Sequence, residues 1–236
     1  MGSRDKNVLT LLLIMVIVII VGLIGYLGFE IVNGKVKESQ SEEITDEFDS
    51  QIPTVTEDEL VVDENIVTTP NEENTGSSTN SGGTSTSSSY SGSSYSSSGV
   101  NISGYWVVGT IRIPATGIKY SIFSEPTRQA LERGVGQVYT TGGLNQPGNT
   151  VISGHNYRNR LFFSKNKNLK IGDTVIIKDT SGLEITYVIY DKFTTDSNDA
   201  SFFQRNTDGK REITLTTCTD DGTKTGQRLI ILAREQ

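Results

Sequence analysis

A cysteine and an arginine that could act together lie near the C-terminal end of the chain. Cys218 closes one stretch of alternating apolar and polar residues, and Arg228 opens the next such stretch. If the two stretches are antiparallel neighbouring strands, the thiol and the guanidinium come to the same end of a sheet. The alternation also predicts that Thr216 shares a face with Cys218, whereas Thr217 points to the other face.

The chain has a single histidine that could assist this thiol. His155 follows the apolar residues 151–152 and the pair Ser153-Gly154, at a predicted strand end. A thiol attacks as its thiolate, which a nearby imidazolium or guanidinium favours. Arg228 keeps its charge and presents several donors in a fixed fork, which suits an oxyanion or a peptide carbonyl. These residue types indicate nucleophilic catalysis by Cys218 with His155 and Arg228.

Each of the three residues also has a plainer interpretation. A lone cysteine at a strand end is more often a small buried hydrophobe than a nucleophile. A single loop histidine is more often polar surface, and Arg228 could be a rim charge on the last strand. By themselves, the three residues leave a catalytic and a structural role as alternatives.

Short strands must position these residues. From Val100 onward, alternating apolar and polar runs between turn residues predict strands. The predicted strands are 111–113, 120–123, 135–139, 150–153, 173–178, 185–190, 211–218 and 228–233. Short helices are predicted over Thr127–Arg133 and Arg158–Asn168. About eight strands with two short helices predict a mainly β fold, a closed or nearly closed barrel without exposed sheet edges.

A long apolar segment lies near the N-terminus. Residues 8–29 carry no charge and, as a helix, would span about 33 Å, enough for a hydrocarbon core of ~30 Å. A cleaved signal peptide is the alternative, but its apolar region is shorter and ends in a small-residue cleavage site. Arg4 and Lys6 precede the segment and favour a cytoplasmic N-terminus. We therefore expect residues 1–7 inside the cell, a transmembrane anchor over 8–29, and the remainder outside.

The segment from residue 30 to 99 lacks the composition of a folded domain. Residues 38–73 hold 13 acidic residues and no Lys or Arg, and residues 75–99 hold 13 Ser, five Gly and four Thr. Such chains cannot bury enough apolar surface to order themselves. The sequence predicts a disordered linker over 30–99 that lifts a domain of residues 100–236 clear of the membrane without fixing its orientation.

Composition also excludes several functions. Residues 100–236 contain 17 basic and 13 acidic residues, a net of +4 without a basic run, which argues against nucleic-acid binding. One Cys excludes an intramolecular disulfide. With one Cys and one His, and no ligand-spaced cluster, no metal site is expected.

The residues around Cys218 resemble a known family. Thr214-Leu215-Thr216-Thr217-Cys218 matches the TLxTC signature of sortases. Arg228 follows ten residues later, and a Gly-His pair lies 63 residues upstream. The likeness covers Val100 to Gln236, and the anchor and linker also fit it.

The resemblance implies an eight-stranded barrel and a two-step transpeptidation. Cys218 would attack the Thr carbonyl of an LPxTG-like sorting signal on a surface protein, and an amine of a peptidoglycan precursor would resolve the thioacyl enzyme. His155 would act as acid and then base, Arg228 would support the oxyanion or substrate, and Thr217, with Thr216, would assist. It also implies a thiol peptidase at the plasma membrane of a Gram-positive-type bacterium, with its catalytic domain outside.

The resemblance indicates the sortase subclass and the calcium dependence less directly. No lid motif and no second span occur, which disfavours pilus assembly, and residues 154–163 look more like class B or class D members. Asp196, Asn198 and Asp199 could bind calcium as in some relatives, but the spacing of an EF-hand loop is absent, so no cofactor is expected. Asp220 and Asp221 could orient His155 or simply form a turn.

Two other functions stay open. A membrane-tethered cysteine peptidase would use water as the acceptor. A non-catalytic surface module on a flexible stalk would fit the anchor and linker equally well.

Overall fold

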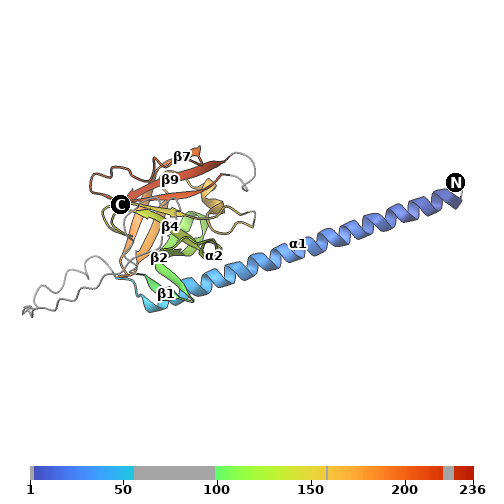
Figure 1. Cartoon of the computed structure of the whole chain (residues 1–236), viewed down its shortest axis with the longest axis horizontal. Helices are drawn as coiled ribbons and strands as arrows, with labels where there is room; N and C mark the ends of the chain where they lie inside the picture. The colour runs from blue at the N-terminus through green and yellow to red at the C-terminus, as the bar shows by residue number, and fades with distance from the viewer. Residues whose placement is uncertain (1–2, 56–98, 158, 220–225) are drawn as a thin grey trace, which may run out of the picture.

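The computed structural model describes residues 3–55, 99–157, 159–219 and 226–236. Within these ranges, nine strands form one sheet, and eight of them close into a barrel (Figure 1). The predicted fold class, a mainly β barrel of eight strands with few helices, is confirmed.

The strands are short, as expected from the sequence. They are β1 (Val100–Ile102), β2 (Tyr105–Ile113), β3 (Ile118–Phe123), β4 (Val135–Thr140), β5 (Gly148–Ser153), β6 (Thr174–Asp179), β7 (Glu184–Asp196), β8 (Arg211–Cys218) and β9 (Gln227–Glu235). The barrel order is β2-β3-β4-β5-β8-β9-β7-β6, and β6 pairs back with β2. Strand β1 pairs with β2 outside this ring. The pairs β3–β4 and β5–β8 are parallel.

Alternation along the strands fills the barrel with branched apolar side chains. Ile213 and Leu215 of β8 lie in this core. Their neighbours there include Ile111, Ile122, Ile152, Ile177, Ile189 and Ile231. β-branched residues fit a pleated surface that is half buried, which explains why these runs form strands. The core therefore fixes the register of β5, β8 and β9, the strands that carry the predicted site.

The predicted short helices are present with one correction. Helix α2 (Arg128–Leu131) begins after Thr127, whose Oγ1 accepts a hydrogen bond from the Ala130 amide at 3.2 Å. The helix predicted over residues 158–168 begins only at Phe163, as the 3-10 helix η3 (Phe163–Asn168). Arg160 and Phe162 have φ of 66° and 54°, and left-handed residues cannot continue a right-handed helix. Another 3-10 turn, η2 (Pro114–Thr116), links β2 to β3.

The N-terminal helix α1 (Ser3–Gln51) is 49 residues long and projects beyond the barrel (Figure 1). Its segment from residue 11 contains an 18-residue window of mean hydropathy 3.0, none of which is buried within the protein. By length and composition this is a candidate membrane span.

The predicted disorder of residues 30–51 is wrong, because α1 continues through them. Ile44 and Phe48 are 4% and 0% exposed and pack with Ile102, Val107 and Phe123 of the sheet. Ile44, Phe48 and the partly buried Ile52 recur every four residues, a helical stripe within an otherwise acidic segment. Burial of this stripe against the barrel stabilises a helix that composition alone would not support. Residues 56–98, the rest of the predicted linker, lie outside the described residues.

Candidate active site

Cys218 is the last residue of β8, is exposed to solvent, and lies directly opposite Arg228 of β9. The next pair is joined by a hydrogen bond from the Thr219 amide to the Gln227 carbonyl at 3.2 Å. Hydrogen-bonded and non-hydrogen-bonded pairs alternate, so Cys218 and Arg228 form a non-hydrogen-bonded pair, the kind in which the side chains lie closer together. Side chains of such a pair project from the same face, as expected from the sequence.

Arg228 is half-buried and contacts the end of β7. Its Nε donates a hydrogen bond to the Ser197 carbonyl at 3.5 Å, and the Ser197 amide donates to the Gly226 carbonyl at 2.6 Å. These contacts hold the start of β9 against the segment that follows β7. The guanidinium is thereby anchored at the end of the barrel where Cys218 lies.

Strand β5 brings His155 to the same end. It runs parallel to β8 with Ser153 opposite Thr216, and the Gly154 amide donates to the Thr216 carbonyl at 3.2 Å. The Thr217 hydroxyl donates to the Gly154 carbonyl at 2.7 Å. A side chain at Gly154 would place its Cβ 2.8 Å from the Phe163 ring, so only glycine fits this close approach. Both predicted threonines therefore tie the strand of Cys218 to the residue that precedes His155.

Asn156 extends this connection by one step. Its Nδ2 donates a hydrogen bond to the Cys218 carbonyl at 2.8 Å, two residues beyond the carbonyl that the Gly154 amide contacts. A side-chain amide thus continues the β5–β8 ladder after β5 has ended. The sequence reasoning did not assign this role, and its only signal was the position of Asn156 directly after His155.

The His155 ring lies in an aromatic environment. It stacks on Tyr157 with centroids 4.7 Å apart and meets the edge of Phe162 at 6.5 Å. The Phe163 amide donates to the His155 carbonyl at 3.0 Å, which closes the loop. Within the described ranges, Nε2 of His155 is buried and has no hydrogen-bond partner. Phe162 has a positive φ, and a backbone conformation of this kind costs a non-glycine residue of order 1–3 kcal/mol. This strained residue lies in the loop of His155.

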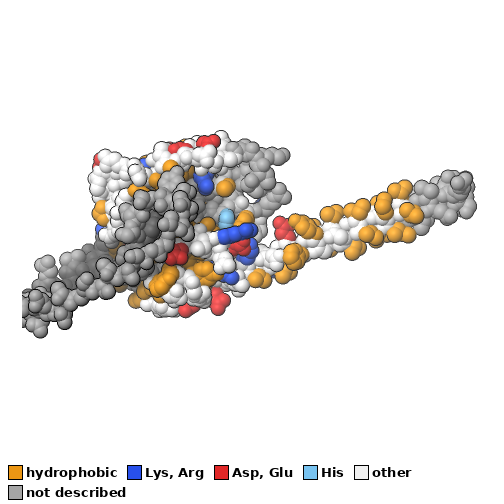
Figure 2. All heavy atoms as spheres, in the orientation of Figure 1, with side chains coloured by type: hydrophobic (Ala, Val, Ile, Leu, Met, Phe, Trp, Pro, Cys, Tyr) orange, Lys and Arg blue, Asp and Glu red, His pale blue; other side chains and the backbone are white. Residues whose placement is uncertain are grey.

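Charges from α1 and α2 act on this imidazole. Burial lowers the pKa of His155; Glu132 opposes this, while Lys37 and Arg128 lower the pKa further. Lys37 pairs with Glu132 at 3.0 Å and lies 5.3 Å from the centroid of the Tyr157 ring. Figure 2 shows the histidine beside basic and acidic side chains, near where α1 leaves the barrel. At neutral pH the ring is therefore mainly neutral and able to accept a proton.

Lys37 and Glu132 were missed by the sequence reasoning. Lys37 falls in the segment predicted to be a linker, and Glu132 was interpreted only as part of a helix. Nothing in the spacing of either residue connects it with His155. The link depends on the docking of α1, which brings two distant segments to one place.

The carboxylates after β7 form local turns. The Asp196 carboxylate accepts from the Asn198 amide at 2.9 Å, and the Asp199 carboxylate accepts from the Thr195 hydroxyl at 2.5 Å and the Ser201 amide at 2.8 Å. No group of three potential metal ligands occurs in the part of the chain that the structure describes. Asp220 and Asp221 lie outside it. The expectations on cofactors and calcium stay predictions.

A closed barrel that carries a thiol opposite a guanidinium, with an imidazole on the adjoining loop, defines a class of β-barrel proteins equipped for acyl transfer. The family model described as Sortase domain matches residues 111–236, more than half of the chain. The chain therefore belongs to the sortase family, and this membership makes it a cysteine transpeptidase in general terms.

Solved sortase structures share the fold. Streptococcus agalactiae sortase C1, in complex with MTSET, aligns with TM-score 0.50 and 20% identity over 55% of this chain and 69% of that chain. Actinomyces oris sortase C-1 aligns with TM-score 0.50 and 22% identity over 55% of this chain and 72% of that chain. The lid mutant of Corynebacterium diphtheriae sortase A aligns with TM-score 0.51 and 24% identity over 56% of this chain and 71% of that chain.

At these identities the likeness establishes the fold alone. No curated protein matches the chain. Because proteins named sortase A and sortase C are about equally similar, the comparison assigns no subclass. The class B-like or class D-like character of residues 154–163 stays a prediction.

Proposed function

We propose that this sortase cleaves an LPxTG-like sorting signal through a thioacyl intermediate on Cys218 and transfers the signal-bearing protein to an amine of a cell-wall precursor. The observation that carries the proposal is the exposed Cys218 directly opposite Arg228, beside the loop of His155. The sorting signal, the acceptor and the three roles are part of the proposal.

In the first step, Sγ of Cys218 attacks the carbonyl carbon of the signal's Thr. His155 takes the proton of the Cys218 thiol as the C–S bond forms, and it passes this proton to the departing amine as the peptide C–N bond breaks. Arg228 donates to the oxyanion that develops on the carbonyl oxygen. Thr216 and Thr217 act through the backbone they hold, because the Thr217 hydroxyl is already engaged with the Gly154 carbonyl.

In the second step, the acceptor amine attacks the thioester carbon. A C–N bond forms, the C–S bond breaks, His155 takes the proton of the amine, and the thiolate is released. The neutral state that burial favours for His155 suits this proton acceptance. We place the reaction outside the plasma membrane of a Gram-positive-type bacterium, with α1 as the single-pass anchor.

Intact-mass spectrometry of the full chain in detergent tests the proposal. Mixed with LPxTG-like peptides, the wild type should gain the mass of the acyl fragment, and Cys218→Ala should gain none. Because Cys218 is exposed, the substitution should change stability by no more than about 0.5 kcal/mol. An adduct that persists in Cys218→Ala would rule out the thioacyl mechanism. An unmodified wild type across a broad panel would favour the non-catalytic surface module.

The exposure of Cys218 supports a second candidate, a peptidase with water as acceptor. An exposed thioester is accessible to water as well as to an amine. Product analysis with and without an added oligoglycine amine separates the two. A ligated product in the presence of the amine supports transpeptidation, whereas hydrolysed peptide alone under both conditions supports the peptidase.

A further inference from the structure

The contacts between α1 and the barrel follow one another along the helix. Closest to the apolar run, Gly34 lies against Asn159, since a Cβ at Gly34 would be 3.7 Å from the Asn159 Nδ2. One turn further, Lys37 pairs with Glu132 and covers the ring of Tyr157. These first contacts therefore involve the loop that carries His155.

Further along α1, the contacts move away from that loop. Thr45 and Ser121 share a hydrogen bond of 3.0 Å between their hydroxyls. Asp46 and Asp49 then pair with Lys119, at 3.0 and 3.1 Å. Ser121 and Lys119 both belong to β3, so this part of α1 packs against β3.

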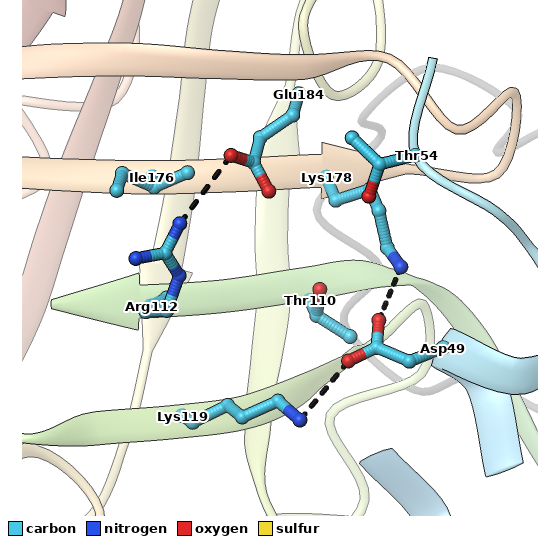
Figure 3. A pocket seen from close by; sticks show the side chains of 8 residues that line it. All are labelled: Asp49, Thr54, Thr110, Arg112, Lys119, Ile176, Lys178 and Glu184. Atoms are coloured by element: carbon cyan, nitrogen blue, oxygen red, sulfur yellow. Dashed lines mark hydrogen bonds and ion pairs between the residues drawn. The ribbon is translucent and has the colours of Figure 1, made fainter. Parts of the chain in front are cut away.

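A charged cavity marks the far end of this contact. It has a volume of about 240 Å3 and lies between the C-terminal part of α1 and strands β2, β3 and β6 (Figure 3). Asp49 points between Lys119 and Lys178 and pairs with both, while Arg112 pairs with Glu184 at 3.3 Å. Lys178 also donates to the Ile52 carbonyl at 3.0 Å. The charged side chains that line the cavity pair with one another, and the ion pairs of Asp49 hold α1 against the barrel.

The order of these contacts orients the barrel. Strand β5 ends at Ser153 and leads directly into the loop of His155. Tyr157 and Asn159 of this same loop are the residues that α1 contacts next to its apolar run. The end of the barrel with His155, Cys218 and Arg228 is therefore the end closest to the apolar part of α1. Figure 1 shows the apolar half of α1 extending away from the barrel as a straight helix.

The distance along α1 is short. Gly34 lies five positions after Phe29, the last residue of the uncharged run. At 1.5 Å per residue this is about 7.5 Å along the helix axis. The headgroup region on each side of a bilayer is roughly 5–7 Å thick. With the apolar run in the hydrocarbon core, the loop beside Gly34 lies at the outer edge of the headgroups.

We propose that the active-site end of the barrel rests on the lipid surface, with Asn159 and Arg160 facing anionic headgroups. Arg160 is exposed, and so are Lys35 of α1 and Arg128 of α2. Glu30 and Glu38 are exposed on the same helix and offset part of this positive charge. The continuity of α1 with the barrel contact therefore carries the argument, and the basic side chains add to it.

This inference rests on the proposed function only in treating that end of the barrel as the reacting end; its position comes from the contacts of α1. The expected flexible tether would leave the orientation free. The docked helix instead holds Cys218 beside the membrane surface, within reach of chains that emerge from the same bilayer.

Fluorescence quenching in vesicles tests the orientation. The full chain carrying Cys218→Ala is labelled at Arg160→Cys or, as a control, at Lys210→Cys. Lys210 is exposed and directly precedes β8, at the opposite end of that strand from Cys218. In phosphatidylglycerol vesicles with a headgroup-linked quencher, the label at 160 should be strongly quenched and the label at 210 should not. Equal quenching at both positions, or none at 160, would overturn the proposal.

A second variant tests the role of docking. Asp49→Lys should repel Lys119 and Lys178 and release α1, while the barrel keeps its near-ultraviolet circular dichroism. Quenching at position 160 should then fall towards that at 210. Undiminished quenching in a protein whose helix has been released would contradict the mechanism. Because these proteins lack Cys218 and no activity is measured, the result is independent of the proposed chemistry.

Discussion

His155 is the only histidine in the chain, so its protonation can be followed as a single NMR signal. Its pKa should lie below the usual value near 6.5, because burial disfavours the charged ring and Lys37 and Arg128 add to this effect. As the pH rises, the ring should thus become neutral earlier than a free histidine.

Replacing Lys37 should move this titration in a defined direction. In Lys37→Met, a cation that lowers the pKa of His155 is removed, and Glu132, which raises it, loses its ion-pair partner. The midpoint of the imidazole titration should therefore shift upward. The matched control is Lys35→Met, an exposed residue two positions away on α1 that does not act on the ring. Coincident curves for wild type and Lys37→Met would argue against this coupling.

The sequence predicted the positions of Cys218 and Arg228 because residues 212–216 alternate between polar and apolar and residues 229–233 form a continuous apolar run, and β8 was placed at its observed bounds. Their catalytic roles, with that of His155, stay predictions. It did not predict Asn156, Lys37 or Glu132 as neighbours of the site. The amide of Asn156 contacts a main-chain carbonyl, and any Asn would look the same in sequence.

At the scale of the elements, the junction of β5 and β8 depends on one side chain. Asn156→Ala removes the 2.8 Å bond to the Cys218 carbonyl. A hydrogen bond contributes about 0.5–1.5 kcal/mol, so the rate of thioacyl formation should fall roughly three- to tenfold. Single-turnover mass spectrometry measures this rate. The exposed Asn101→Ala serves as the control.

The slower thioacyl formation of Asn156→Ala should be distinguishable from a general loss of structure. The unfolding midpoint in urea should change little, because Asn156 lies in a partly exposed loop at the end of the barrel. Asn156→Asp, which keeps the shape but cannot donate, should be as slow as the alanine variant. If Asn156→Asp formed the thioacyl enzyme as fast as the wild type, or if unfolding fully explained the loss of rate, Asn156 would have no positioning role.

The α1 extension shows why element boundaries were harder to predict than strands. Ile44, Phe48 and Ile52 form a helical stripe, but acidic residues surround it and the average composition indicated disorder. The stripe becomes stable only because β1, β2 and β3 supply an apolar surface for it. Such a surface is assembled from residues about 50 to 80 positions away, which no local pattern reveals.

At the scale of the whole molecule, a buried charge network joins the β7–β8 connection to the barrel wall. The side chain of Glu212 is fully buried and pairs with Arg205 at 2.7 Å, with Arg234, and with the Tyr190 hydroxyl at 2.8 Å. Arg205 belongs to the connection, and Asn149 binds the carbonyls of Phe202 and Phe203 at 3.1 and 2.9 Å. Barrel closure and the packing of this connection both depend on contacts between residues far apart in the sequence, so local patterns did not predict them.

Glu212→Gln should reduce stability at neutral pH and abolish part of its acid dependence. Burial raises the pKa of Glu212, but hydrogen bonds from Tyr190, Arg234 and Arg205 more than offset this, so the pKa lies below its usual value. A depressed carboxyl pKa stabilises the fold above the unfolded value near 4.3 and loses this stabilisation as the pH falls. We expect a loss of about 2–3 kcal/mol at pH 7, below the 3–5 kcal/mol of a fully buried pair, because Arg234 is partly exposed.

Urea unfolding at pH 7 and pH 3 checks this expectation. The difference between wild type and Glu212→Gln should shrink at pH 3. Glu235→Gln, which breaks the more exposed pair with Arg211, should cost less than about 1 kcal/mol. If the two variants were equally stable at pH 7, the network would not contribute as described.

The continuity of α1 also constrains how the molecule can move. No proline interrupts the helix between Ser3 and Gln51, and the barrel is fixed to its side. Rotation of the helix about its own long axis therefore moves the docked barrel around that axis. Cys218 would sweep a circle at constant height above the bilayer, so the direction in which the thiol faces changes while its depth does not.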